Sequence, residues 1–335
     1  MYSSNISRLH HFDIMKGIAI ILMVMGHVMQ FSFGFNPSEP VKSIYFNMPL
    51  FFYISGYLAY KRFQSVGEVC QRIGHRGMLL LVPYIAFLCL YHVFSTSEMP
   101  SLSTLLGGGG RYWFLYTLFI LSVFFMIFEY IIRKVEREWL YIALWMLPFC
   151  LLVIVKSYIA RSNEWGGYFD VIMGLVNYYR YYLIGYFCRK YIRFNHFLFE
   201  NELTFALGFV AYFLNWYFYD LHNMFLIFFG TLGAIIMIQT FVRCYINADD
   251  KCGRLLVSVG KCSLGIYVIH YFFIPDVSTV THSFLTCGNP YIWQLAFALS
   301  LAIPITVTSM LVFKLMEMNK YLFLLFFGKK TVRQL

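Results

Sequence analysis

The sequence predicts an all-α protein: a polytopic integral membrane bundle of about ten transmembrane helices, with both termini in the cytoplasm. Of the 335 residues, 60% are hydrophobic and only 13% are charged, and the mean hydropathy is +0.66. A soluble domain carries about a quarter charged residues, so this chain has too little polar surface to dissolve. Apolar runs of spanning length recur along the chain, and the basic residues between them alternate between two sides.

Ten segments come close to the roughly 20 mostly apolar residues that a span needs. They are 14–32, 43–60, 77–95, 112–131, 139–156, 168–188, 202–219, 222–242, 255–275 and 291–313. The connections are short, the longest being 61–76, 96–111, 189–201, 243–254 and 276–290. We therefore expect one transmembrane domain over residues 8–313 and a short basic cytoplasmic tail over 314–335. The two halves do not show the matching broken spans that inverted-repeat transporters often have.

The basic residues set the orientation. With the N-terminus in the cytoplasm, and with Lys156 and Lys261 near the ends of their spans counted with the adjoining loops, 20 of the 26 Lys and Arg residues fall on the inner side and 4 on the outer side, and Lys16 and Arg180 are counted within spans. This is the bias of a membrane protein toward positive inner loops. It accounts for the net charge of +10 without nucleic acid, which we do not expect as a partner. The cysteines and histidines lack the spacing of metal ligands, so no metal is expected.

The first span, "HHFDIMKGIAIILMVMGHVMQF", contains Asp13, Lys16 and His27. Ionisable groups are costly in a span and often mark a functional site. At 100° per residue, the eleven steps from Lys16 to His27 return to nearly the same helix face, about 16 Å further along. Asp13 precedes Lys16 by three residues and is placed to pair with it. The alternatives are a lysine that reaches the cytoplasmic interface and a histidine that serves packing.

Two later spans also hold ionisable groups. Arg180 lies near the middle of the sixth span, where it keeps its charge and needs a counter-ion, carbonyl groups or an anionic ligand. A structural ion pair fits equally well. His270 lies in the outer half of the ninth span, at roughly the depth of His27. The two histidines either share one cavity or contact different neighbours.

Further polar residues interrupt the second and fourth spans. In "YFNMPLFFYISGYL", Asn47 and Ser55 are candidate contacts for a substrate, although a kinked packing helix explains the pattern as well. In "RYWFLYTLF", Arg111 and Trp113 open a span at the outer face. They belong either to an interfacial aromatic belt or to a substrate or headgroup site.

Five stretches carry a resemblance to a known family: "FDIMKGIAIILMVMGH", "FNMPLFFYISGYL", "WFLYTLF", "RYYLIGYFCRK" and "GKCSLGIYVIH". In this order they resemble the landmarks of the acyltransferase-3 family, bacterial integral-membrane acyltransferases that typically O-acetylate surface carbohydrates. The resemblance covers about residues 8–313. It implies a ten-helix bundle in the inner membrane, acetyl-CoA used from the cytoplasm, and an acceptor hydroxyl acylated at or beyond the outer side. The family's basic residue, eleven positions before an essential histidine, maps onto Lys16 and His27. Many relatives have His where this chain has Asn47.

The residues and the resemblance together predict an O-acyltransferase that transfers acetyl from cytoplasmic acetyl-CoA to an extracytoplasmic or lipid-linked carbohydrate. His27 is the expected general base, because its ordinary pKa suits proton transfer from a hydroxyl. Asp13 and Lys16 would organise the donor side, and Lys16 and Arg180 are expected near the CoA phosphates or the thioester oxygen. His270, Asn47 and Ser55 would line the site. The rival function is a transporter or flippase for a saccharide or small solute, since polar residues in spans suit that role too. A non-catalytic membrane partner is a second rival.

Overall fold

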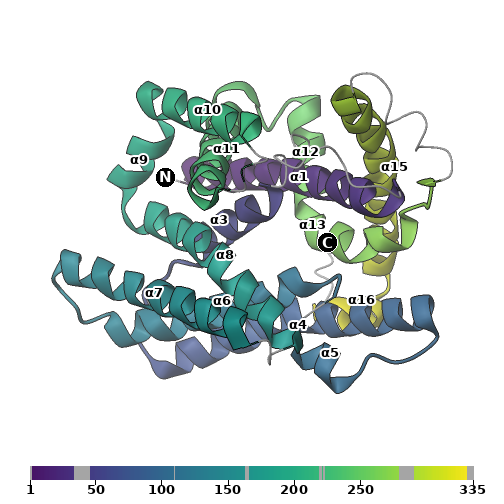
Figure 1. Ribbon diagram of the computed structural model, residues 1–335, viewed down its shortest axis with the longest axis horizontal. Helices are drawn as coiled ribbons and strands as arrows, with labels where there is room; N and C mark the ends of the chain where they lie inside the picture. The colour runs from purple at the N-terminus through teal and green to yellow at the C-terminus, as the bar shows by residue number, and fades with distance from the viewer. Residues whose placement is uncertain are drawn as a thin grey trace. The chain divides into compact units, whose positions relative to one another are not determined.

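The structure is a computed structural model that describes residues 2–33, 46–108, 110–162, 166–218, 221, 223–278 and 290–329 (Figure 1). The regular elements within these ranges are all helices. They are α1 (Tyr2–Ser32), α3 (Asn47–Ala59), α4 (Val66–Thr96), α5 (Leu102–Leu106), α6 (Trp113–Ile132), α7 (Glu138–Ser162), α8 (Gly166–Lys190), α9 (Ile192–Phe199), α10 (Glu202–Tyr217), α11 (Met224–Tyr245), α12 (Lys251–Lys261), α13 (Ser263–Ile269), the 3-10 helix η2 (His270–Phe273), α15 (Pro290–Met318) and α16 (Lys320–Phe327).

The predicted class, a helical membrane protein, is confirmed. In the part of the chain that the structure describes, six helices are long and apolar enough to cross a membrane. Two bent pairs, α9 with α10 and α12 with α13, raise the number to eight if each pair is one span. All ten predicted segments contain a helix, but α3 has only 13 residues. The number ten and the cytoplasmic position of the termini stay predictions.

Several predicted connections contain helix. α4 starts at Val66, so most of the predicted connection 61–76 is helical. The reason is a capping signal that hydropathy does not detect: the Ser65 hydroxyl accepts the N–H of Glu68, and the Glu68 carboxylate accepts the N–H of Gln64. α5 and α9 lie in the predicted connections 96–111 and 189–201, and α16 lies in the segment predicted as a tail.

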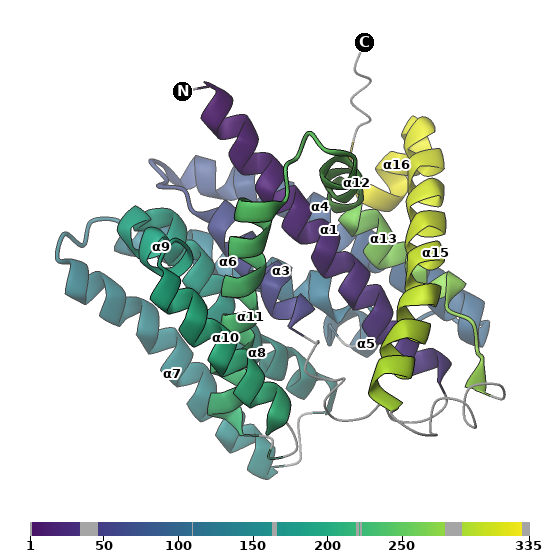
Figure 2. The ribbon, with the colours of Figure 1, turned by 90° about the horizontal axis from the view of Figure 1, so that it is seen from above.

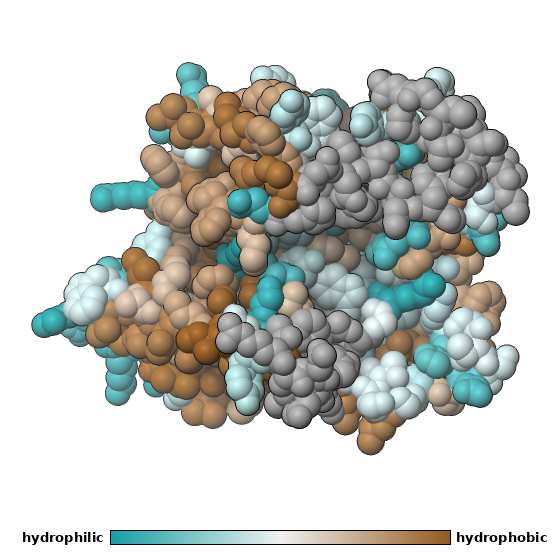
Figure 3. Space-filling model, in the orientation of Figure 1, coloured by the Kyte–Doolittle hydropathy of each residue, from teal (hydrophilic) through white to brown (hydrophobic). Residues whose placement is uncertain are grey.

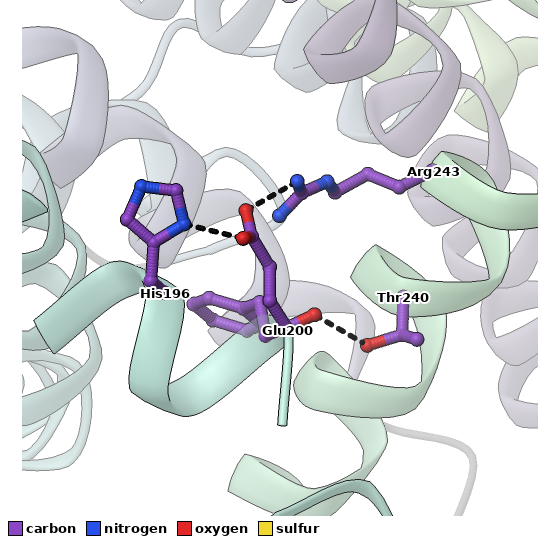
Figure 4. A network of polar contacts seen from close by, with 5 residues as sticks. His196, Glu200, Thr240 and Arg243 are labelled. Atoms are coloured by element: carbon purple, nitrogen blue, oxygen red, sulfur yellow. Dashed lines mark hydrogen bonds and ion pairs between the residues drawn. The ribbon is translucent and has the colours of Figure 1, made fainter. Parts of the chain in front are cut away.

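The chain divides into two compact units, and the first contains Met1–Ile54 and Phe187–Lys314. Within it, α10 and α11 run side by side in both ribbon views (Figures 1 and 2). Small residues allow this close approach: a Cβ added to Gly233 would lie 2.2 Å from the carbonyl oxygen of Gly208. An exposed ionic network joins α9 to α11, in which Glu200 contacts both His196 and Arg243 (Figure 4).

Two glycines hold α12 against the N-terminal half of α1 in the same unit. A Cβ on Gly17 would lie 2.4 Å from the carbonyl oxygen of Leu256, and one on Gly260 would lie 1.8 Å from that of Asp13. Beyond Lys261 the chain bends by 61° into α13 and η2. The tight contact and the bend together bring residue 270 back to the far half of α1.

The second unit contains Ser55–Tyr186 and Leu315–Leu335. In it, α4 packs against α6 and α16. Trp145 of α7 is fully buried and stacks on Phe125 of α6. The outward faces are apolar, as a lipid-facing surface requires: Figure 3 shows hydrophobic residues gathered over α7 of this unit and over α10 of the first. On α7 the exposed ones include Trp139, Leu147, Leu151, Ile154 and Tyr158.

Candidate active site

The first unit brings His27 of α1 into direct contact with His270 at the start of η2. The Nδ1 atom of His27 lies 2.8 Å from Nε2 of His270. The ring planes differ by only 9°, while the ring centroids are 5.0 Å apart. With the nitrogens so much closer than the centroids, the rings meet edge to edge, and each nitrogen's in-plane lone pair or N–H points at the other ring. The sequence leaves open whether the two histidines meet or contact different neighbours, and the structure shows that they contact each other.

Two further groups complete this cluster. The Tyr271 hydroxyl lies 3.3 Å from Nε2 of His27, and Nδ1 of His270 lies 3.0 Å from the carbonyl oxygen of Ile266. His270 is fully buried, whereas His27 is half-buried. The cluster therefore has one fully enclosed imidazole and one that is partly exposed.

Lys16 and Asp13 form an ion pair at the other half of α1, with 3.1 Å between Nζ and Oδ1. Both side chains are mostly buried, with relative exposures of 26% and 16%. α1 is continuous from Tyr2 to Ser32, so the predicted relation between Lys16 and His27 holds along one helix. The ammonium and the imidazole are thus separated by about three helical turns.

Asn47 and Ser55 lie on α3. The Asn47 side chain is buried, and its Oδ1 accepts the N–H of Met48 at the first turn of the helix. This contact satisfies one of the amide groups that a helix start leaves open. Ser55 is half-buried on the same helix.

The remaining predicted site residues belong to the second unit. Trp113 stacks on Tyr178, with ring centroids 5.2 Å apart. The Arg111 guanidinium lies 4.8 Å from the Tyr91 ring centre, and that of Arg180 lies 5.1 Å from the Tyr181 ring centre. All three residues thus pack against tyrosines. The two arginine contacts are cation–π interactions, which offset part of the free-energy cost of burying a guanidinium.

A basic cleft in the second unit was missed by the sequence analysis. It has a volume of about 690 Å³ and is lined by Lys61, Glu68, Gln71, Arg72, His75, Arg76 and Leu79. Most of these residues lie one turn apart on the first part of α4. If the cap at Ser65 had been recognised as a helix start, the helical spacing of the residues after it would have predicted that they share one face. Three cations face one carboxylate, which makes the cleft suited to an anion.

No group of three or more His, Cys, Asp or Glu residues in the described ranges is arranged to hold a metal ion. The prediction that the protein needs no metal remains untested by this arrangement.

The fold and the contact between His27 and His270 define a helical membrane protein with a polar cluster among its helices. The family model of acyltransferase-3, described as an acyltransferase domain, matches residues 9–311. The chain therefore belongs to that family, as its motifs indicate, and is a membrane acyltransferase.

Two relatives carry the name nodulation protein NolL. The protein from Mesorhizobium japonicum (strain LMG 29417 / CECT 9101 / MAFF 303099) is 27% identical over 300 residues, covering 77% of this chain and 74% of its own. The protein from Sinorhizobium fredii (strain NBRC 101917 / NGR234) is 34% identical over 135 residues, which cover 35% of this chain and 37% of its own length. No solved structure matches the chain.

Proposed function

We propose that this membrane acyltransferase moves an acetyl group from cytoplasmic acetyl-CoA to a hydroxyl of an extracytoplasmic or lipid-linked carbohydrate. The reaction joins the acetyl carbon to the hydroxyl oxygen and releases CoA as the thiol. The hydroxyl proton must leave before or during attack, so the site needs a general base.

The observation that carries the proposal is the contact of His27 with His270 and Tyr271 in a helical membrane acyltransferase. A half-buried histidine with hydrogen-bonded neighbours is held in one orientation, and a neutral imidazole has a nitrogen lone pair that can accept a proton. His27 is therefore the proposed base. Lys16, paired with Asp13 about three helical turns from His27, is a proposed cation for the CoA part of the donor rather than for the reacting carbonyl.

The basic cleft of the second unit is the proposed site for the nucleotide end of acetyl-CoA. That end carries phosphate groups, and arginine forks such as Arg72 and Arg76 bind phosphate oxygens in pairs. The cleft volume lies in the range of sites for small-molecule cofactors. We place this segment on the cytoplasmic side, as the charge distribution along the sequence predicts, which is also the side proposed for the donor.

Arg180, Arg111 and Trp113 are proposed contacts for the carbohydrate or the donor in the second unit, and Asn47 and Ser55 are proposed lining residues of α3. We further propose ten spans, with both termini in the cytoplasm, in a bacterial inner membrane. This topology supplies the donor from one side and the acceptor from the other.

The test uses the sidedness of the donor. Acetyl-CoA does not cross a bilayer, so radiolabelled acetyl-CoA should label carbohydrate in inside-out membrane vesicles and not in right-side-out ones. Mass spectrometry of surface glycans from cells with and without the protein should show added acetyl groups that depend on it. These spectra also identify the acceptor.

The rival function gives a different outcome. A transporter or flippase moves unmodified glycan across the membrane, and no acetyl-CoA is consumed. Glycans of equal mass with and without the protein, together with protein-dependent movement of glycan, would overturn the proposal.

A further inference from the structure

The geometry points to His270 as a positioning residue that fixes which nitrogen of His27 acts as the base. This inference rests on the proposed function and adds a specific role for a second histidine. It assigns the basic lone pair to Nε2 of His27 and the proton of the neutral ring to Nδ1.

The chain of hydrogen bonds starts at a backbone carbonyl. The oxygen of Ile266 can only accept, so Nδ1 of His270, 3.0 Å away, must carry a proton. The same oxygen also accepts the backbone N–H of His270, as the last bond of α13. A carbonyl oxygen has two lone pairs, so both bonds form at once. His270 is therefore anchored by its backbone and by its ring to the same atom.

The anchor determines the state of the second nitrogen. In neutral His270 a proton on Nδ1 leaves Nε2 with a lone pair. That lone pair faces Nδ1 of His27 at 2.8 Å, so Nδ1 of His27 must donate. Nε2 of His27 then has the lone pair, and the Tyr271 hydroxyl at 3.3 Å donates to it. Each of these four groups has a role that agrees with the others.

The burial of His270 keeps this arrangement in place. The residue is fully buried, and its ring contacts Tyr271, with centroids 4.0 Å apart. The two imidazoles are nearly coplanar, which is the geometry for a bond between in-plane groups. A ring fixed in this way selects one tautomer of its partner, as the third member of a catalytic triad does.

The acceptor hydroxyl replaces the Tyr271 hydroxyl at the lone pair of His27 Nε2 and gives its proton to that nitrogen, and its oxygen forms the new bond to the acetyl carbon. The imidazolium so formed keeps its Nδ1–H bond to His270, which spreads the charge toward the buried ring. When the carbon–sulfur bond breaks, Nε2 returns the proton to the thiolate, and CoA leaves as the thiol. Both rings end neutral.

The direct test measures the tautomer and needs no activity. The full-length protein, labelled with ¹⁵N-histidine and placed in lipid bilayers, is studied by solid-state NMR, with the His27 signals assigned by their loss in His27→Gln. We expect Nδ1 of His27 to be protonated and Nε2 to be unprotonated at a pH where both rings are neutral. A protonated Nε2 in the neutral ring would overturn the inference.

The kinetic test separates positioning from packing. His270→Gln retains an acceptor at the place of Nε2, whereas His270→Leu has none. We expect His270→Leu to lower kcat for acetyl transfer roughly a hundredfold or more, with the KM for acetyl-CoA unchanged. The kcat of His270→Gln should be at least tenfold higher than that of His270→Leu. The control His92→Leu should have the kcat of the wild type. Equal rates in the Leu and Gln variants would contradict the inference. If the wild type transfers no acetyl group, the proposed function fails, and the NMR measurement still decides the tautomer.

Discussion

Gly260 lies so close to Asp13 that no side chain fits between α12 and α1. A Cβ at position 260 would be 1.8 Å from the Asp13 carbonyl oxygen, which is backbone and cannot move aside. This contact fixes the start of the bent segment that leads to His270. The position of His270 beside His27 therefore depends on a glycine ten residues earlier in the chain.

Gly260→Ala should destabilise the protein by about 1–3 kcal/mol or more, because the two helices must separate. It should also reduce acetyl transfer by displacing His270 from His27. The matched control is Gly74→Ala on α4, where an added Cβ meets nothing within 4 Å. Thermal unfolding of the purified variants checks the prediction, and equal midpoints for the two variants would contradict it.

Lys16→Met should lower acetyl transfer at least tenfold, since it removes the cation and leaves the Asp13 carboxylate mostly buried without its partner. Lys16→Arg keeps the charge and should stay within about tenfold of wild type. The double variant Asp13→Asn/Lys16→Met separates the two causes. If Lys16 serves the donor, the double variant stays slow; recovery to the wild-type rate would show that the pair is only structural.

Arg72→Gln and Arg76→Gln should raise the KM for acetyl-CoA severalfold or more and leave the KM for the carbohydrate unchanged. The reason is the loss of a charged partner for phosphate in the basic cleft. Arg193→Gln, an exposed arginine of α9, is the control. Steady-state kinetics with varied donor at fixed acceptor measures the effect. An unchanged donor KM in both variants would exclude this cleft as the phosphate site.

Tyr141→Phe should lower the free energy of unfolding by about 1–3 kcal/mol, because the buried carboxylate of Glu129 loses the hydroxyl that donates to it. Tyr158→Phe changes an exposed tyrosine on the same helix and should have no measurable effect. Glu200→Gln, in the exposed network of Figure 4, should cost less than about 1 kcal/mol. The midpoints of thermal unfolding of the three variants test this order, and an effect at Tyr158 equal to that at Tyr141 would contradict it.

The sequence predicts the helical membrane class from its composition and the face shared by Lys16 and His27 from helical spacing. The acyltransferase-3 family comes from the resemblance of the chain's motifs to those of known proteins. The sequence also places His270 near the depth of His27. It leaves their contact open, since the bend after Lys261 and the close approach at Gly260 depend on long-range packing. The basic cleft was missed because hydropathy assigns residues 66–76 to a connection, while the cap at Ser65 begins α4 there.

The proposed role of His27 is to act as the base of an acetyl transfer. The most direct measurement uses purified protein in liposomes with radiolabelled acetyl-CoA and the carbohydrate identified by mass spectrometry. We expect labelled carbohydrate and an equal amount of released CoA with wild type and with the control His92→Ala. With His27→Ala we expect at least a hundredfold less of both. Undiminished labelling by His27→Ala, in protein that unfolds at the wild-type temperature, would show that His27 is not the base.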